Sequence, residues 1–177
     1  MVAGEKVEVN PIWACRAFPA FPVALVAVGD GNGNKNIITV VLVHMFSFYP
    51  PVLGIGVSPA RHSYQLLEEA DDFSINIPGK ELVEEVLYCG QKSGREVDKF
   101  EDCGFIEVPS KKIRSPVIAE CVVSLECVKR QRIEAGDHVW YLGEVVHAEM
   151  TKDMDRENAL MYWSGEFRVL GDVIRRR

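Results

Sequence analysis

Two apolar runs separated by five turn-forming residues constrain the fold more than any other feature of this chain. In "PVALVAVGDGNGNKNIITVVLV", Asp30–Asn34 is dense in residues that tolerate positive φ, which predicts a hairpin loop. Both flanking runs are rich in Val and Ile, as strands buried on both faces tend to be. We therefore expect two adjacent strands inside the core.

A third strand is predicted in "PPVLGIGVSP", where the side chains alternate between two faces. Leu53, Ile55 and Val57 fall on one face, and Gly54 and Gly56 fall on the other. Two glycines on one face leave bare backbone there. Either neighbouring strands pack closely against it, or a flat ligand or another chain lies on it.

The rest of the chain reads as further strands with short helices between them. We expect a helix over 64–70, a strand over 73–78, an amphipathic helix over 80–90 that ends at Gly90, and a helical turn over 95–100. The inward stripe of the amphipathic helix is Leu82, Val83, Val86 and Leu87. Two long strands over 119–130 and 138–150 follow, joined by 131–137. The pattern does not alternate strand and helix, which argues against a doubly wound parallel sheet. It predicts one domain, 1–177, that is mostly β.

Composition narrows the classes of function. The formal net charge is −6, and the only dense basic run is Arg175–Arg177, which argues against nucleic-acid binding. No apolar stretch reaches the roughly 20 residues of a membrane helix, and the N-terminus lacks the apolar core of a signal peptide, so a cytoplasmic protein is expected. Five cysteines without a Cys-x-x-Cys pair argue against a disulfide framework and against a zinc site.

Three hydrogen-bond donors stand side by side where the third strand gives way to a helix. They are Arg61, His62 and Ser63. The first amides of a helix point outward and carry partial positive charge, so a guanidinium, an imidazole and a hydroxyl added there suit a phosphate monoester. The alternative is that Ser63 is only an N-cap and that the other two are surface residues.

A second candidate segment is "CGQKSGREVDKF". It places Cys89, Gly90, Ser93, Gly94 and Lys99 after the end of a predicted helix. A glycine-containing loop with a hydroxyl and an ammonium could close on the same anion, although a solvated connector is the alternative. A thiolate beside a phosphate would be repelled by it, so we expect Cys89 to be neutral.

Taken together, these segments resemble the flavin reductase-like family of FMN-binding split barrels, in the branch that includes flavoredoxin and similar archaeal flavoproteins. The matching pieces span most of the chain: "NIITVV", Ser47 with "PPVLGIGV", "RHSYQLL", "FSINIP", "CGQKSGREVDKF", "SLEC", "GDH" and "GEV". The resemblance implies a Greek-key split β-barrel that forms a homodimer and holds FMN near the subunit interface.

The resemblance also implies roles for individual residues. The isoalloxazine ring would be bordered by Thr39, Val40, Val41 and Leu42. The remaining cofactor-binding residues would be Asn36 and Ser47 in the matching strands, Arg61, His62 and Ser63 at the phosphate, and Cys89, Gly90, Ser93 and Lys99 on the far side. In "GDH", His138 would lie where a nicotinamide docks, whereas the sequence alone also allows a simple turn before a strand.

The function expected from the resemblance is an FMN-dependent oxidoreductase. NADH or NADPH would bind transiently, and electrons would pass to free flavin, ferric iron or a redox protein. Three alternatives remain open: an FMN electron carrier with little nicotinamide activity, a pyridoxamine-phosphate oxidase-like enzyme, and a protein that binds another phosphorylated ligand or none. His44 and Met45 depart from the residues common in the family, and the segment 161–177 matches nothing assigned.

Overall fold

The computed structural model describes residues 4–18 and 20–175, so two of the three C-terminal arginines lie outside the described residues. The strands are β1 (Phe21–Pro22), β2 (Ala24–Gly29), β3 (Lys35–Val40), β4 (Val43–Phe48), β5 (Pro51–Val57), β6 (Asp72–Ile77), β7 (Glu107–Val108), β8 (Val117–Ile118), β9 (Val123–Ala135), β10 (His138–Met150), β11 (Met161–Trp163) and β12 (Glu166–Arg168). The helices are α1 (Pro11–Arg16), α2 (His62–Glu69), α3 (Val83–Gln91) and α4 (Lys99–Asp102), with 3-10 turns η1 (Lys80–Leu82) and η2 (Arg156–Asn158).

Seven antiparallel strands form the main sheet, in the order β3-β2-β6-β9-β10-β5-β4. The sheet is not closed, because β3 and β4 remain as its two edges. It curls far enough for β3 to contact β5 across the opening. The chain is therefore mostly β with short helices and forms a Greek-key split barrel, as the sequence predicted.

Strand β2 lies between two hydrophobic clusters and contributes one of its faces to each. Ala24, Val26 and Val28 pack into one cluster with α2, and Leu25 and Ala27 pack into the other with α3 and α4. All six residues of β2 are buried, as predicted, whereas β3 is an edge strand in which Lys35 and Thr39 stay partly exposed. The loop at 30–34 also forms as predicted, with Gly31 at φ 77° and Gly33 at φ 101°.

Several element boundaries differ from the sequence prediction, since α2 covers 62–69, β6 covers 72–77, α4 covers 99–102 and β9 begins only at Val123. Strand β9 continues to Ala135, so 131–135 pairs with β10 and the connection is the two-residue turn Gly136–Asp137. Gly136 has φ 65°, the region that such hairpin turns favour. Helix α3 ends at Gln91 rather than at Gly90, and the absent side chain serves packing, because a Cβ at Gly90 would lie 3.3 Å from the Cβ of Thr39.

The inward stripe of α3 is also shifted. Leu87 is 39% exposed, whereas Cys89 is buried in the core. The stripe of α3 that packs into the core therefore runs through Val83, Val86 and Cys89.

The glycine face of β5 is covered by side chains of the same molecule. A Cβ at Gly54 would lie 2.3 Å from the ring of Phe46, and a Cβ at Gly56 would lie 3.0 Å from Leu42 and 3.1 Å from Trp140. Close packing is therefore the reason for these glycines. Their small size lets aromatic and aliphatic side chains lie directly on the strand.

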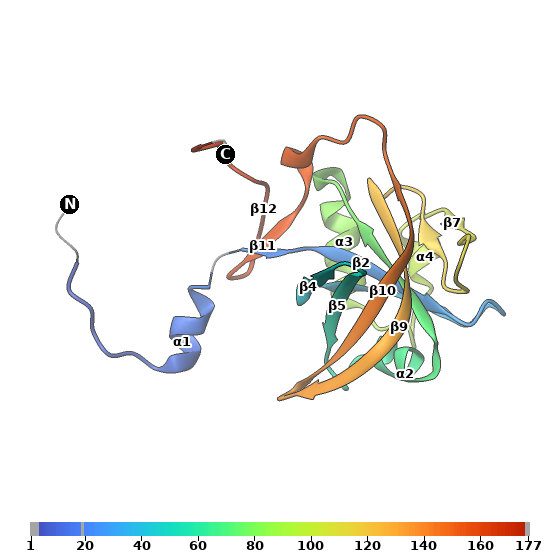
Figure 1. The fold of residues 1–177 in the computed structure, drawn as a ribbon, viewed down its shortest axis with the longest axis horizontal. Helices are drawn as coiled ribbons and strands as arrows, with labels where there is room; N and C mark the ends of the chain where they lie inside the picture. Colours follow the sequence, from blue (N-terminus) through green and yellow to red (C-terminus); the bar gives the residue numbers. More distant parts are fainter. Residues whose placement is uncertain (1–3, 19, 176–177) are drawn as a thin grey trace.

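The two ends of the described chain lie outside the main sheet. Helix α1 buries none of its residues, and in Figure 1 the N-terminal segment (blue) projects away from the barrel. Strands β11 and β12 form a hairpin that pairs with β1 in a separate sheet. Among the described helices, none has the length and apolar character needed to cross a membrane.

Candidate anion pocket and adjoining groove

A small cavity opens where strand β3, the first turn of α2, the end of α3 and the start of α4 meet. Its volume is about 80 Å³. It is lined by Asn36, Ile38, Ala60, Arg61, His62, Ser63, Cys89, Gly90, Gln91, Lys92, Ser93, Gly94 and Lys99. We call this cavity the anion pocket, because its lining includes three cationic side chains and, among the described residues, no Asp or Glu.

Lys99 is the most deeply buried of the three cationic side chains that line the anion pocket. It is only 4% exposed, and its Nζ donates to the backbone oxygens of Ile37 at 2.7 Å and Cys89 at 2.8 Å. In residues 4–18 and 20–175 no carboxylate forms an ion pair with it. Burial lowers the pKa of Lys99, because its charge has left water without an opposite charge nearby.

Arg61 and His62 stand at the mouth of the anion pocket. Arg61 is exposed, and its Nη1 lies 3.4 Å from the backbone oxygen of Gly90. The Nδ1 atom of His62 is buried without a hydrogen-bond partner in the described part of the chain. Burial, together with the positive charge of Arg95, lowers the pKa of His62, which keeps its ring neutral near pH 7.

The first turn of α2 carries no side-chain cap. Arg61 is the N-cap residue, and no side-chain hydrogen bond satisfies the amides that follow it. The N-cap interpretation of Ser63 is therefore wrong, since Ser63 is the second residue of the helix and is 1% exposed. Uncapped amides at a helix N-terminus are the groups that bind anions.

Cys89 forms part of the pocket wall from α3. It is 1% exposed, and its Sγ lies 3.8 Å from the Sγ of Cys103. Burial raises the pKa of the Cys89 thiol far above its ordinary value, so the sulfur carries no charge that would oppose an anion.

A larger groove of about 440 Å³ adjoins the anion pocket. It follows the open edge of the barrel between β3 and β5, and it shares Ile38, Ala60 and Arg61 with the pocket. The other lining residues are Thr39, Val40, Val41, Leu42, Gly56, Val57, Ser58 and His138. We call it the strand groove. The two spaces adjoin, with a cationic end and a length lined by both aliphatic and polar groups.

His138 enters the strand groove from the first residue of β10. Its Nδ1 lies 2.8 Å from Oδ1 of Asp137, a carboxylate that accepts the Nδ1 proton. This hydrogen bond lowers the pKa of Asp137. The imidazole is therefore held with Nδ1 engaged and Nε2 available to a ligand.

The structure brings the residues predicted for the site together, with one exception. The anion pocket collects Asn36, Arg61, His62, Ser63, Cys89, Gly90, Ser93 and Lys99, and the strand groove collects Thr39, Val40, Val41, Leu42 and His138. Ser47 lies in β4 and lines neither space. The lining residues that the sequence interpretation did not assign are Ile38, Val57, Ser58, Ala60, Gln91 and Lys92, of which only Lys92 carries a signal, as a cation in the predicted loop.

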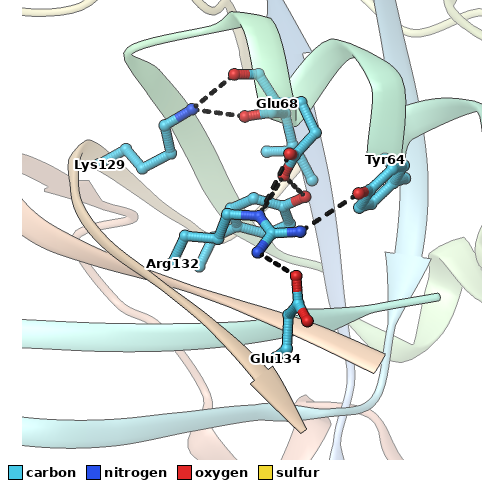
Figure 2. A network of polar contacts seen from close by, with 7 residues as sticks. Tyr64, Glu68, Lys129, Arg132 and Glu134 are labelled. Atoms are coloured by element: carbon cyan, nitrogen blue, oxygen red, sulfur yellow. Dashed lines mark hydrogen bonds and ion pairs between the residues drawn. The ribbon is translucent and has the colours of Figure 1, made fainter. Parts of the chain in front are cut away.

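The opposite end of α2 is fixed by a network of polar contacts (Figure 2). Glu68 accepts from Tyr141 Oη at 2.6 Å and from Arg132 Nε at 2.8 Å. Arg132 also donates to Tyr64 Oη at 3.3 Å, and Lys129 Nζ donates to the backbone oxygens at the end of the helix. Because Tyr141 is fully buried in β10, the network attaches α2 to the centre of the sheet.

Comparison with known proteins identifies the family of this chain. The family described as flavin reductase like domain matches residues 16–171, a range that contains the whole anion pocket and strand groove. The chain belongs to this flavin reductase-like family.

Individual relatives and solved structures show how far the similarity extends. An uncharacterized protein of Archaeoglobus fulgidus is 32% identical over 72% of this chain and 72% of its own. The NADH-dependent FAD reductase of Streptomyces globisporus is 29% identical over 86% of this chain and 82% of its own. The crystal structure of flavoredoxin from Methanosarcina acetivorans shares the fold at a TM-score of 0.85 and 24% identity, over 98% of this chain and 95% of that one.

Proposed function

We propose that this chain binds FMN, with the phosphate in the anion pocket and the isoalloxazine ring along the strand groove. The observation that carries the proposal is Lys99, a buried ammonium without a carboxylate partner in the described chain, in a pocket lined by no acidic residue. A buried charge normally needs an opposite charge close by, and here a ligand would supply it. In a chain with net charge −6, this local excess of cations is selective for an anion.

The donors of the anion pocket suit a phosphate monoester in particular. A monoester carries close to two negative charges at pH 7 and three strong acceptor oxygens. Arg61, the hydroxyl of Ser63 and the uncapped amides come from the start of α2, and Lys99 comes from α4. The orphaned Nδ1 of His62 is a further group that a ligand could satisfy. The residues present therefore fit the phosphate of FMN.

The proposed reaction is NAD(P)H-dependent reduction, with electrons passing to free flavin, ferric iron or a redox partner. Bound FMN would supply the hydride-accepting chemistry. The chain itself would shield the ring with the aliphatic side chains of the strand groove and orient the nicotinamide through His138, whose ring is fixed by Asp137. The similarity to the NADH-dependent FAD reductase of Streptomyces globisporus supports this direction.

An electron carrier is the second candidate. The fold matches flavoredoxin from Methanosarcina acetivorans, and a carrier would need the same flavin site without productive nicotinamide binding. The two functions differ in one measurable step, the reduction of bound flavin by NADH or NADPH.

We also propose that the chain forms a homodimer through edge strand β4 and the turn after it. Phe46 is 51% exposed, Phe48 72% and Tyr49 97%, on an unpaired sheet edge. Large apolar side chains on an open edge favour association, and a second copy offers the same surface. A monomeric mass for the FMN-bound protein in light scattering would contradict this proposal.

The direct test is reconstitution followed by anaerobic reduction. Purified protein mixed with FMN and desalted should retain a flavin absorbance spectrum. Addition of NADH or NADPH without oxygen should then bleach it within seconds if the chain is a reductase. Retained flavin without bleaching would identify the electron carrier, and a colourless protein after reconstitution would contradict both functions.

The variant His138→Ala separates binding from reduction. Since His138 lines the groove from β10 and is absent from the anion pocket, FMN retention should change little. The rate of flavin reduction by nicotinamide should fall at least about tenfold if the ring positions the substrate. Asp137→Ala should produce a smaller loss of the same kind. Equal stopped-flow rates for the wild type and His138→Ala would remove this role.

A further inference from the structure

A buried amide lies directly behind the hydroxyl that faces the anion pocket. Asn36 in β3 is 4% exposed, and its Nδ2 donates to Oγ of Ser63 at 2.7 Å. Ser63 is 1% exposed, and both residues line the pocket. The contact joins two segments that are 27 residues apart in the sequence.

The direction of this hydrogen bond determines what Ser63 can offer to a ligand. A hydroxyl has one proton to donate and lone pairs to accept with. Since Oγ already accepts from Asn36, its proton remains to be donated, and within the described residues no acceptor takes it. A phosphate oxygen in the pocket would be that acceptor, in a charge-assisted hydrogen bond.

We propose that Asn36 positions the hydroxyl of Ser63 as a donor to the phosphate, and thereby sets the preference of the site for FMN over riboflavin. The proposal rests on the proposed function, since it assigns a selective role within the same anion pocket. Asn36 acts through Ser63, so it is a positioning residue for phosphate recognition.

Gly94 supplies a second observation. A Cβ at this position would lie 2.2 Å from Oδ1 and 2.5 Å from Cγ of Asn36, so the loop backbone packs directly on the amide. The φ angle of Gly94 lies outside the left-handed region, so backbone conformation does not require glycine here. Glycine is required because Asn36 occupies the space that a side chain would need. The loop in turn holds the amide of Asn36 against Ser63.

The test measures the affinities for FMN and riboflavin separately, by quenching of flavin fluorescence. Asn36→Leu keeps the size of the side chain and removes its hydrogen bonds. Asn36→Leu and Ser63→Ala should each lower the ratio of FMN to riboflavin affinity about tenfold or more, as loss of a hydrogen bond to a charged group implies. The double variant should fall no further than the single ones, because both changes remove the same donor.

Gly94→Ala tests the same contact with Asn36 left chemically intact. It should lower the ratio in the same direction, whereas Gly171→Ala, a glycine with no atom within 4 Å of its added Cβ, should leave it unchanged. Thermal melts check that each variant is folded. If Asn36→Leu does not fold, the affinity ratio of Gly94→Ala tests the role of Asn36 instead.

Three results would overturn the inference. They are additive losses in the double variant, equal losses for both flavins, and an unchanged ratio in Gly94→Ala. A wild-type protein that binds FMN no better than riboflavin would remove the phosphate assignment itself, and with it this inference. Failure of the proposed function and failure of the role of Asn36 are thus distinguishable.

Discussion

The polar groups at the two ends of α2 are arranged in opposite ways. At the C-terminal end, Glu68 accepts from Tyr141 and Arg132, and Lys129 satisfies backbone oxygens (Figure 2). At the N-terminal end, Arg61 has no ion pair in the described chain, and the first amides carry no side-chain cap. One end is complete within the protein, whereas the other leaves donors and positive charge for a ligand.

The two ends of this short helix therefore have different roles. The C-terminal end stabilises the fold, and the N-terminal end is available for binding. Burial favours the neutral form of Glu68, but hydrogen bonds from Tyr141 and Arg132 outweigh it, and the pKa of Glu68 lies below its usual value. The network therefore stabilises the fold above the ordinary pKa of Glu68, and this contribution is lost as the pH falls through the lowered value. At the open end, the guanidinium of Arg61 and the first amides are left for an anion to satisfy.

The largest predicted effect comes from removing donors at the open end. Arg61→Ala combined with Ser63→Ala should weaken FMN binding by roughly 3–6 kcal/mol, since each charge-assisted hydrogen bond contributes about 1.5–3 kcal/mol. Riboflavin binding should change far less, because riboflavin lacks the phosphate. Flavin content after extensive dialysis measures the effect, and an unchanged FMN content would contradict the assignment of the anion pocket.

A matched change at the closed end should alter stability instead. Tyr141→Phe removes the fully buried hydroxyl that donates to Glu68 and should lower the free energy of unfolding by about 1–3 kcal/mol. The ratio of FMN to riboflavin affinity should stay unchanged, since Arg132 and Lys129 still hold the helix. Urea denaturation of the apoprotein measures the loss.

Tyr88→Phe is the control for that experiment. The hydroxyl of Tyr88 also donates to a carboxylate, that of Asp102, but this pair is exposed. Its loss should therefore be smaller than that of Tyr141→Phe. If both variants lost the same stability, or if Tyr141→Phe changed the flavin ratio, the contrast between the two ends of α2 would not hold.

The contrast also marks what the sequence could and could not predict. The open end was predictable, because Arg61, His62 and Ser63 are consecutive and sit at a strand-to-helix boundary that periodicity identifies. The loop from Cys89 to Lys99 was recognisable from its glycines and its cation. Local residue types carried both signals, and the family resemblance placed them in one site.

The closed end was not predictable, because its partners are distant in sequence. Glu68 and Tyr141 are 73 positions apart, and only the pairing of β10 in the sheet brings them together. The burial of Lys99 has the same origin, since its two acceptors belong to β3 and α3. The covered glycines of β5 depend on Phe46 and Trp140, whose rings reach them from neighbouring strands.

The smallest predicted effect is a dependence of the open end on alkaline pH. The folded pKa of Lys99 is lowered by burial, and the charged or ionisable groups around it are Arg61, Cys89 and Cys103. The unfolded chain therefore binds more protons between the folded and unfolded pKa values of this lysine. The stability of the apoprotein should rise with pH across that window, because protonated Lys99 disfavours the folded state.

Bound FMN should reverse this dependence. The phosphate dianion stabilises the charged ammonium, so the affinity for FMN should fall as the pH rises through the lowered pKa of Lys99, whereas the affinity for riboflavin should stay level. Lys99→Met removes the charge and should flatten the difference between the two flavins, although cysteines and tyrosines titrate in both proteins. Parallel pH profiles for FMN and riboflavin in the wild type would mean that Lys99 does not interact with the phosphate. The phosphate would then be bound at the open end of α2 without a contribution from Lys99.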